Sequence, residues 1–348
     1  MQTLPGCSTG ICASIGRTCS DLRTVQRVIE AGAGNIRFAL GLRDRDFFKD
    51  LDVVQEAASA ADQTIHLLFD LPSTRPRVGE MPTHRFHAGD RVLIKDQERF
   101  DGVGAGFIPV PGIRAFGNKL KRGDRIFFRD SRQEFRLQTD GNEPLLIAEC
   151  ITCAEAIQSC VGCSFPDSDM AFKPISNQDA DLMRAVAERG VHPSAVVPSF
   201  ITGPEPLLET RAFVDEVWPG KGVQVLAKFE VASALDIIDD LLAVADGGLI
   251  GRGDLGMSLA PEHLPHAQRQ VAEGTRKAGK PFLVASQILE RYAATGMPYR
   301  AELSDVSLSI QQGAQIIVLC QETNDSQRPV EAVAMARRII EAEAACAS

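Results

Sequence analysis

Three residues of types that could do chemistry lie at the ends of two neighbouring apolar segments. Lys228 and Glu230 stand in VQVLAKFE, and Asp254 stands in GLIGRGDLG, one strand–helix unit later. Because side chains alternate faces along a strand, Lys228 and Glu230 are expected to point the same way. Two carboxylates are hard oxygen ligands for a divalent metal, and a lysine beside them suits an anionic substrate. The spacing therefore predicts a metal-assisted site for an anion.

These residues need a fold that brings successive strand ends together. The hydrophobic pattern of the 348-residue chain predicts alternating strands and helices, with three strands before residue 82 and five after residue 166. Eight such units predict a (β/α)₈ or TIM barrel, whose chemistry lies at the C-terminal ends of the strands. The expected strands cover residues 10–15, 36–40, 65–69, 195–200, 223–228, 248–251, 282–285 and 316–319.

Between the third and fourth strands the pattern changes. Short β-rich runs such as RVLIK, RIFFR and EFRLQ follow one another, separated by Gly, Asp and Asn turns, without an amphipathic helix. This predicts a small β-barrel-like domain inserted after strand 3. The expected organisation is residues 1–82 as the first part of the barrel, 83–165 as the inserted β domain, and 166–348 as the second part of the barrel.

Composition and charge narrow the function classes. Hydrophobic residues make up 44% and charged residues 24%, with a formal net charge of −9. Basic residues are scattered rather than interleaved with aromatics, so we expect no nucleic-acid partner. No apolar run reaches the roughly 18 residues of a membrane span. The N-terminus MQTLPGCSTG has no signal-peptide pattern. We therefore expect no membrane contact and a cytoplasmic location.

The sequence contains nine cysteines, four of which form two CxxC pairs. Cys150, Cys153, Cys160 and Cys163 could hold a structural zinc ion through four thiolates. The alternative is a short hairpin with small residues at half-buried positions, since cysteines three apart on a strand point to opposite faces. Disulfides are less expected in a cytosolic protein. The sequence leaves the choice between zinc and a hairpin open.

Several motifs in the same order resemble the pyruvate kinase family. LAKFE and GRGDLG are similar to the family's catalytic and metal-binding segments, and GKPFLVASQILE and PYRAELSDVSLSIQQGA are similar to two later ones. The resemblance covers nearly the whole chain and implies phosphoenolpyruvate and pyruvate as substrates, a place in glycolysis, and Mg²⁺ or Mn²⁺ as cofactor. It also implies that the family's C-terminal domain is lacking. Family members often oligomerise, so a homo-oligomer is left open.

The resemblance implies roles for the residues of the best-matched segments. Glu230 and Asp254 correspond to the metal ligands, and Lys228 to the lysine that stabilises the transferring phosphoryl group and the enolate. Backbone N–H groups from Gly253 onward, with Asp254, would bind the substrate carboxylate. Ser286 stands in the place of a threonine involved in proton transfer to the enolate. Without the resemblance, these would be strand-end side chains that cap helices or face solvent.

The early segments match the family less well. Arg37 and Arg77 correspond to two arginines implied to contact phosphate. The Asn and Ser that help hold potassium are replaced within residues 39–43, whereas Asp70 persists as a remnant of the monovalent-cation site. Arg75 replaces a glutamate, and beside Asp70 its guanidinium could supply the missing positive charge. On this interpretation K⁺ is not required. The alternative is that Arg75 is a surface arginine in a polar loop.

The nucleotide side of the site has lost further contacts. Val161 stands where a nucleotide-contacting lysine is expected, and Leu42 stands where the family has a histidine. We therefore expect poor use of ADP. The favoured hypothesis is a pyruvate-kinase-like phosphotransferase with a divergent nucleotide side. The alternatives are a metal-dependent lyase or decarboxylase that forms a pyruvate enolate, and a catalytically weak binding paralogue. The phosphoryl acceptor is not determined by the sequence.

Overall fold

The computed structural model describes residues 1–348 apart from 42–44, 102–105, 129–132, 169 and 347–348. The described chain divides into two compact units. The first unit, here called the barrel unit, comprises residues 1–73, 173–255 and 261–348. The second unit comprises residues 74–172 and 256–260. Each unit is described by itself.

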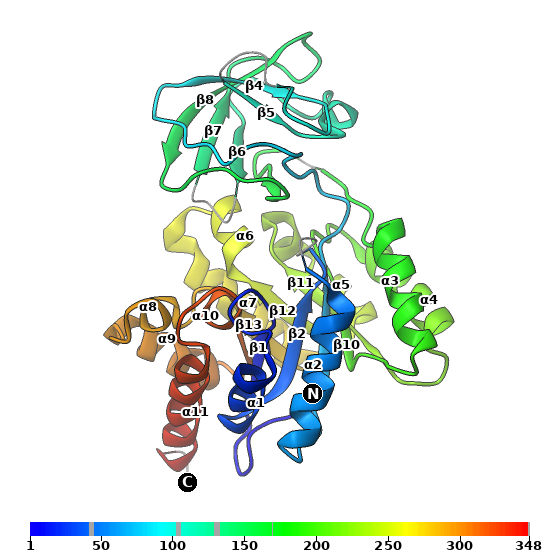
Figure 1. The fold of residues 1–348 in the computed structure, drawn as a ribbon, viewed down its shortest axis with the longest axis vertical. Coiled ribbons are helices and arrows are strands. Elements are labelled where there is room, and N and C mark those ends of the chain that lie inside the picture. Colours follow the sequence, from blue (N-terminus) through cyan, green and yellow to red (C-terminus); the bar gives the residue numbers. More distant parts are fainter. Residues whose placement is uncertain (42–44, 102–105, 129–132, 169, 347–348) are drawn as a thin grey trace. The chain divides into compact units, whose positions relative to one another are not determined.

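The barrel unit confirms the predicted TIM barrel. In the part of the chain that the structure describes, eight parallel strands close in the order β1-β14-β13-β12-β11-β10-β3-β2. Figure 1 labels β1, β2, β10, β11, β12 and β13 among them. The strands are β1 (Gly10–Ser14), β2 (Ala33–Ala39), β3 (His66–Leu71), β10 (Ala195–Pro198), β11 (Gln224–Phe229), β12 (Gly247–Gly251), β13 (Phe282–Ala285) and β14 (Ile316–Leu319). Their C-terminal ends form one mouth, which is where the candidate residues were expected.

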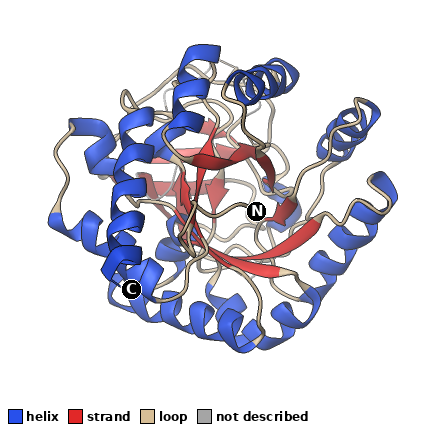
Figure 2. Cartoon of the chain, turned by 90° about the horizontal axis from the view of Figure 1, so that it is seen from below, coloured by secondary structure: helices blue, strands red, loops and turns tan. Residues whose placement is uncertain are grey.

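Helices surround the strands, as the view from below shows (Figure 2). Local signals start them: Asp21 accepts from the backbone N–H of Thr24 at 3.0 Å and caps α1, and Asp46 caps α2. The helices are α1 (Leu22–Glu30), α2 (Phe47–Ala60), α3 (Asn177–Glu188), α4 (Pro204–Val217), α5 (Ile238–Val244), α6 (Arg252–Ser258), α7 (Leu264–Lys277), α8 (Glu290–Thr295), α9 (Arg300–Gln311), α10 (Gln321–Asn324) and α11 (Pro329–Cys346). The sequence pattern did not predict α8 and α10, which lie shortly after the ends of β13 and β14.

The interior of the barrel is a packed apolar core. Its members come from seven of the strands and are mostly small or branched: Cys12, Leu68, Ala195, Val197, Leu226, Leu249, Leu283, Ala285, Ile316 and Val318. Full burial of one branched aliphatic side chain stabilises a fold by about 1.5–3 kcal/mol. This core supports the polar residues at the mouth, because it fixes the strand ends that carry them.

The second unit is a six-stranded sheet in the order β5-β4-β8-β7-β6-β9, inserted after β3 as predicted. Its strands are β4 (Arg91–Lys95), β5 (Phe107–Pro109), β6 (Arg125–Phe128), β7 (Gln133–Leu137), β8 (Leu146–Cys153) and β9 (Cys163–Ser164). The buried rings of Phe128 and Phe135 lie 5.4 Å apart in its core, beside Phe86. The pairs are antiparallel except for β4 with β5.

Both interpretations of the cysteine pairs are wrong. Among the described residues, no group of three or more His, Cys, Asp or Glu could hold a metal ion, which excludes the four-thiolate zinc site. A hairpin is also excluded, because β8 pairs with β4 and β7 whereas β9 pairs with β6. Cys150 and Cys163 are instead buried in the core of the sheet, and burial raises the pKa of the Cys163 thiol to about 12.

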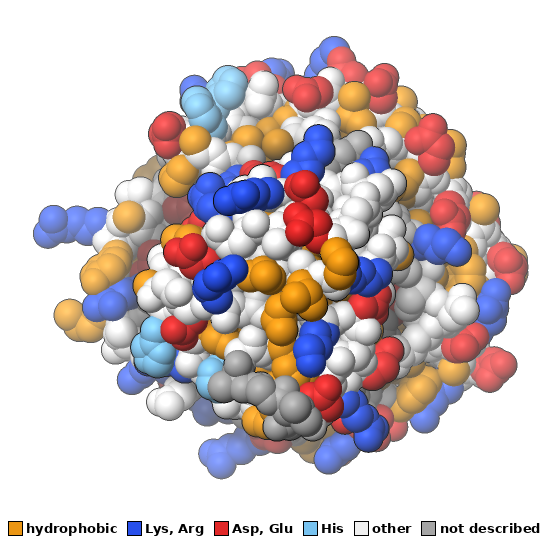
Figure 3. All heavy atoms as spheres, turned by 90° about the horizontal axis from the view of Figure 1, so that it is seen from above, with side chains coloured by type: hydrophobic (Ala, Val, Ile, Leu, Met, Phe, Trp, Pro, Cys, Tyr) orange, Lys and Arg blue, Asp and Glu red, His pale blue; other side chains and the backbone are white. Residues whose placement is uncertain are grey.

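The surface shows mixed charge. On the face seen in Figure 3, Lys and Arg side chains of the described residues are interspersed with Asp and Glu rather than gathered in one basic stripe. Within the described ranges, no helix is both long and apolar enough to span a membrane.

Candidate active site

Lys228 lies at the centre of a polar cluster at the mouth of the barrel. Its Nζ atom lies 3.0 Å from Glu230 Oε2 and 3.1 Å from Asp70 Oδ1, and it donates to Ser199 Oγ at 2.9 Å. Only 13% of the lysine side chain is exposed. Lys228 and Glu230 therefore share one side of the chain at the end of β11, as strand alternation requires. The ammonium group is held by two carboxylates from different strands.

Asp70 joins this lysine to an arginine. Its Oδ2 atom accepts from Nε of Arg37 at 2.8 Å and lies 2.7 Å from Nη2, which is a two-point pairing. Arg37 also donates from Nη1 to Ser14 Oγ at 2.9 Å. The strands β2, β3 and β11 thus contribute one row of alternating charges, Arg37, Asp70, Lys228 and Glu230, and β1 adds the neutral Ser14 beside Arg37.

Burial and ion pairing shift the pKa values of these groups in opposite directions. Burial alone would lower the pKa of Lys228, but Asp70 and Glu230 favour its charged form and the pKa is raised. Burial would raise the pKa of Asp70, yet Lys228 and Arg37 hold it below its usual range. The pKa of Arg37 is raised in the same way by Asp70. The cations and Asp70 are therefore charged at neutral pH.

Glu230 is the most buried member of the row, with 1% of its side chain exposed. Its Oε1 atom accepts from the backbone N–H of Phe200 at 2.6 Å, a residue in the left-handed region with φ 57°. Burial, and next the negative charge of Asp254, raise the pKa of Glu230, although Lys228 acts against them. The carboxylate of Asp254, which follows β12, is therefore near enough to disfavour the charged form of Glu230 at the end of β11.

This arrangement fits a divalent cation. A cation between Glu230 and Asp254 would relieve their mutual repulsion, and carboxylate oxygens are ligands that Mg²⁺ and Mn²⁺ prefer. Gly251 keeps the space open, because a Cβ atom there would lie 3.2 Å from Glu230 Oε2. The described residues contain no third acidic, His or Cys ligand that would complete a protein-only metal group. Substrate and water would have to supply the other ligands.

Ser286 follows β13 and faces the start of α6. A Cβ atom placed on Gly253 would lie 3.6 Å from Ser286 Oγ, so the hydroxyl borders the space that a side chain at Gly253 would fill. Both Ser286 and Gln287 are left-handed, with φ 76° and 53°. Such backbone costs on the order of 1–3 kcal/mol per non-glycine residue and persists only where surrounding contacts enforce it. The hydroxyl is thus held in a defined and strained turn.

Arg77, which the resemblance implied to contact phosphate, and Arg75, which was expected to lie beside Asp70, both belong to the second unit. Arg77 donates from Nη1 to the carbonyl oxygen of Cys160 at 2.9 Å, and Arg75 donates from Nη1 to Ser164 Oγ at 3.3 Å. Their roles toward a substrate stay predictions. Within the barrel unit, Asp70 already has two cationic partners, Arg37 and Lys228, and its pairing with Arg75 stays a prediction as well.

Sequence reasoning missed three contributors to the cluster. The Ser14 hydroxyl accepts a hydrogen bond from Arg37, and the Ser199 hydroxyl accepts one from Lys228. The backbone N–H of Phe200 donates to Glu230. A weak signal was present, because Ser14 ends β1 and Ser199 directly follows β10, where barrels carry functional residues.

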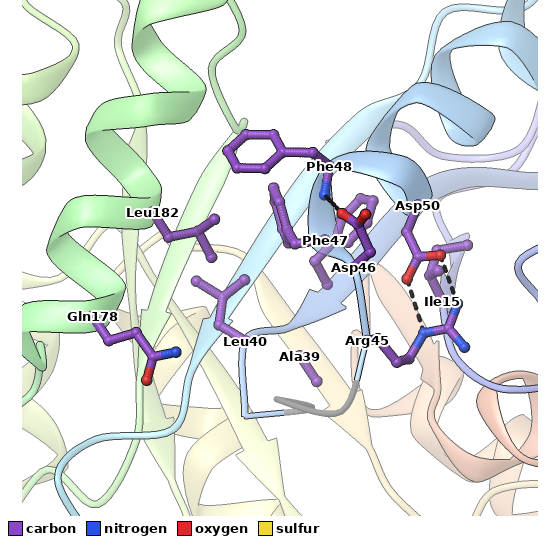
Figure 4. Close-up of a pocket in the computed structure, with 11 residues that line it drawn as sticks. Ile15, Ala39, Leu40, Arg45, Asp46, Phe47, Phe48, Asp50, Gln178 and Leu182 are labelled. Atoms are coloured by element: carbon purple, nitrogen blue, oxygen red, sulfur yellow. Dashed lines mark hydrogen bonds and ion pairs between the residues drawn. The ribbon is translucent and has the colours of Figure 1, made fainter.

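A cavity of about 280 Å³ lies beside β2, α2 and α3 (Figure 4). Phe38 lines it, and since Phe38 follows Arg37 in the strand, the two side chains point to opposite faces of β2. Arg45 and Asp50 close one side through paired hydrogen bonds of 2.8 and 2.6 Å. Leu42 and Arg43, which the sequence comparison singled out near this point, lie outside the described residues. The remaining lining residues are Ile15, Ala39, Leu40, Asp46, Phe47, Phe48, Gln178 and Leu182.

A family model, curated relatives and a solved structure that this chain resembles all belong to pyruvate kinases. The family model for the pyruvate kinase barrel domain matches residues 7–333. A pyruvate kinase from Agrobacterium vitis is 31% identical over 95% of this chain and 68% of its own length. A pyruvate kinase from Thermococcus litoralis is 29% identical over 97% of this chain and 70% of its own length. The crystal structure of a pyruvate kinase from Cryptosporidium parvum has a similar fold, with a TM-score of 0.82 and 21% identity over 99% of this chain and 70% of that one.

Proposed function

The chain belongs to the pyruvate kinase family, and from this premise we propose that it is a phosphotransferase acting on phosphoenolpyruvate and pyruvate. The observation that carries the proposal is the row Arg37, Asp70, Lys228 and Glu230 at the barrel mouth. Phosphoryl transfer depends mainly on positioning and on stabilising negative charge, and this row provides two fixed cations beside a carboxylate pair.

Lys228 is the residue proposed to stabilise the transferring group. Its raised pKa keeps the ammonium protonated across the neutral range, so its charge does not depend on small changes of pH. Arg37 would bind the phosphate from the neighbouring side. Asp70 pairs with both cations, and so limits the rearrangement needed when an anionic substrate arrives.

Glu230 and Asp254 would hold Mg²⁺ or Mn²⁺, which when bound supplies Lewis-acid stabilisation to the substrate's developing negative charge. The backbone at Gly253 and Asp254 would bind the substrate carboxylate, and the Ser286 hydroxyl would deliver a proton to the enolate carbon when pyruvate forms. The position of Ser286 Oγ, 3.6 Å from where a Cβ atom of Gly253 would lie, supports this assignment, because the hydroxyl borders the proposed carboxylate site.

The phosphoryl acceptor is proposed to be a nucleoside diphosphate that binds weakly. Ala39 and Leu40, at the end of β2, offer no polar side-chain contact to it. The loss of one charge-assisted contact typically costs about 1.5–3 kcal/mol, or about 10- to 100-fold in affinity. Phe47 lines the neighbouring cavity, and its ring could partly compensate for the lost nucleotide contacts by stacking on a planar base.

A coupled assay tests the proposal. Purified protein would be supplied with Mg²⁺ or Mn²⁺, phosphoenolpyruvate and a panel of nucleoside diphosphates, and pyruvate formation would be followed. We expect slow, metal-dependent turnover that Lys228→Met abolishes. The matched control is Lys280→Met, because Lys280 also binds protein partners, the carbonyl oxygens of Leu242 and Ala245, but precedes the N-terminal end of β13, whereas Lys228 lies near the C-terminal end of β11. Absence of turnover with every acceptor would contradict phosphotransfer.

A second candidate is a metal-dependent lyase or decarboxylase that forms a pyruvate enolate. It is favoured by the same apolar residues, Ala39 and Leu40, since such an enzyme needs no nucleotide. It would use Lys228, Glu230 and Asp254 to stabilise the enolate. Its distinguishing result is release of pyruvate from a larger 2-oxo acid in the absence of any nucleotide. A protein that binds oxalate but shows neither reaction would be a catalytically weak paralogue.

A further inference from the structure

Two buried charged side chains bind the backbone of the turn at residues 286–289, directly after β13. Arg252 binds carbonyl oxygens of the turn, and Glu322 binds N–H groups. Arg252, the first residue of α6, donates to the Ser286 carbonyl oxygen from Nε at 3.1 Å and from Nη2 at 2.8 Å, and to the Gln287 carbonyl oxygen at 3.3 Å. Glu322 Oε1 accepts hydrogen bonds from the backbone N–H groups of Ile288 and Leu289 at 2.8 and 3.2 Å.

Side chains of two neighbouring helices also hold the Arg252 guanidinium in place. Its Nη1 atom donates to Asp305 Oδ1 at 2.7 Å and to Gln268 Oε1 at 3.2 Å, so α9 and α7 both hold the guanidinium. Only 9% of its side chain is exposed. All three of its nitrogens therefore have protein partners. Arg252 is bound to the scaffold and to the turn, in contrast to the cations Arg37 and Lys228, whose partners are side chains of the mouth.

The contacts of Arg252 lie where the turn is strained. Ser286 and Gln287 are consecutive left-handed residues, and neither is a glycine. Their carbonyl oxygens point to one guanidinium, which can satisfy both only while the turn keeps this conformation. Because Arg252 stands between Gly251 and Gly253, the same bonds also tie the start of α6 to the end of β13, where Gly251 pairs with Ala285.

We propose that Arg252 is a positioning residue, which directs the Ser286 hydroxyl against Gly253 by holding the Ser286 and Gln287 carbonyl oxygens. This inference rests on the proposed function, because it assigns Arg252 to the proton-transfer step that Ser286 performs there. Arg252 touches no reacting atom. It acts through the turn, and its removal affects the enolate step rather than the binding of phosphate by Arg37 and Lys228.

The test compares two steps of the reaction in Arg252→Met. Exchange of pyruvate methyl protons with deuterated solvent reports proton transfer to the enolate, and KM for phosphoenolpyruvate reports substrate binding. We expect the exchange rate to fall about 100-fold, the effect of misplacing a reacting group by about 1 Å, with KM changed less than about threefold. Arg252→Lys keeps the charge but not the forked geometry, and should fall between wild type and Arg252→Met.

A double-variant comparison separates positioning from general damage. If Arg252 acts only through Ser286, then Arg252→Met with Ser286→Ala should exchange protons no more slowly than Ser286→Ala alone. Gln287→Gly should partly restore Arg252→Met, because glycine adopts a φ of 53° without strain. Lys280→Met, which also removes a cation bound to two carbonyl oxygens, should leave the exchange rate unchanged.

Amide hydrogen exchange gives a readout that does not depend on activity. In Arg252→Met, the N–H groups of Ile288 and Leu289 should exchange faster than in wild type, whereas in Lys280→Met they should not. Unchanged protection of this turn, or losses from Arg252→Met and Ser286→Ala that multiply, would overturn the positioning role. If wild type shows neither proton exchange into pyruvate nor phosphotransfer, the proposed function fails, and the amide comparison alone decides whether Arg252 holds the turn.

Discussion

Asp70→Asn is the substitution that most directly tests the row of charges. Asparagine keeps the shape and one acceptor oxygen but removes the negative charge shared by Arg37 and Lys228. Of the two ion pairs, one becomes a hydrogen bond from a cation to a neutral amide oxygen and the other is lost, because the amide NH₂ group faces the second cation. Each lost charge-assisted interaction is worth about 1.5–3 kcal/mol, and two buried cations lose their common counter-charge. We expect the free energy of unfolding of the barrel unit to fall by about 2–4 kcal/mol at pH 7.

Urea unfolding followed by tryptophan fluorescence measures this change. The sequence has one tryptophan, Trp218, which is buried in the barrel unit with its ring 6.3 Å from that of Phe69. The signal therefore reports on the barrel unit rather than on the second unit. Asp50→Asn is the matched control, since it removes a buried carboxylate paired with Arg45 away from the row.

The dependence of the free energy of unfolding on phosphate and on pH distinguishes Asp70→Asn from the Asp50→Asn control. Phosphate should stabilise Asp70→Asn more than wild type, because it can occupy the place of the lost charge between Arg37 and Lys228. The depressed pKa of Asp70 means that its contribution is present above the unfolded pKa of about 3.9 and is lost as pH falls through the folded pKa. The stability gap between wild type and variant should therefore close in acid. Equal stability at pH 7, or a gap that persists unchanged at pH 2, would refute the reasoning.

Three further results are expected. Glu230→Gln should weaken Mn²⁺ binding by about 10- to 100-fold, as for one lost charge-assisted contact, in a titration followed by electron paramagnetic resonance; unchanged affinity would contradict the assignment of Glu230 as a metal ligand. Gly16→Ala should destabilise the barrel unit by about 1–3 kcal/mol in urea unfolding, because the added Cβ would lie 2.3–2.7 Å from Asn324 atoms; an unchanged midpoint would contradict that packing. Elemental analysis of purified protein should find no stoichiometric zinc, and one zinc per chain would contradict the separation of the four cysteines in the second unit.

Much of the fold was predictable because its signals are local. The strands of the barrel repeat an apolar run at regular spacing, and the strands predicted at 282–285 and 316–319 have the observed bounds. The common side of Lys228 and Glu230 followed from strand alternation alone. The short helices α8 and α10 were missed because they have only six and four residues and so carry little periodicity.

The partners of the site residues depended on closure of the barrel. Arg37, Asp70 and Lys228 are individually visible in the sequence, but Asp70 and Lys228 are 158 positions apart. Their pairing exists because β3 and β11 both border β10 in the closed sheet. The role of Arg252 likewise required the observation that Gly251 and Ala285 pair, so that the residues after them meet.

The sequence by itself determined the type of fold and the residues available for chemistry, because strand alternation and helical spacing are properties of neighbours in the chain. Only the tertiary structure decided which charges share a partner, that Asp70 lies between Arg37 and Lys228, and that a buried arginine holds the turn of Ser286. These are distances between residues remote in sequence, and they are set by the register of the closed barrel rather than by any local pattern.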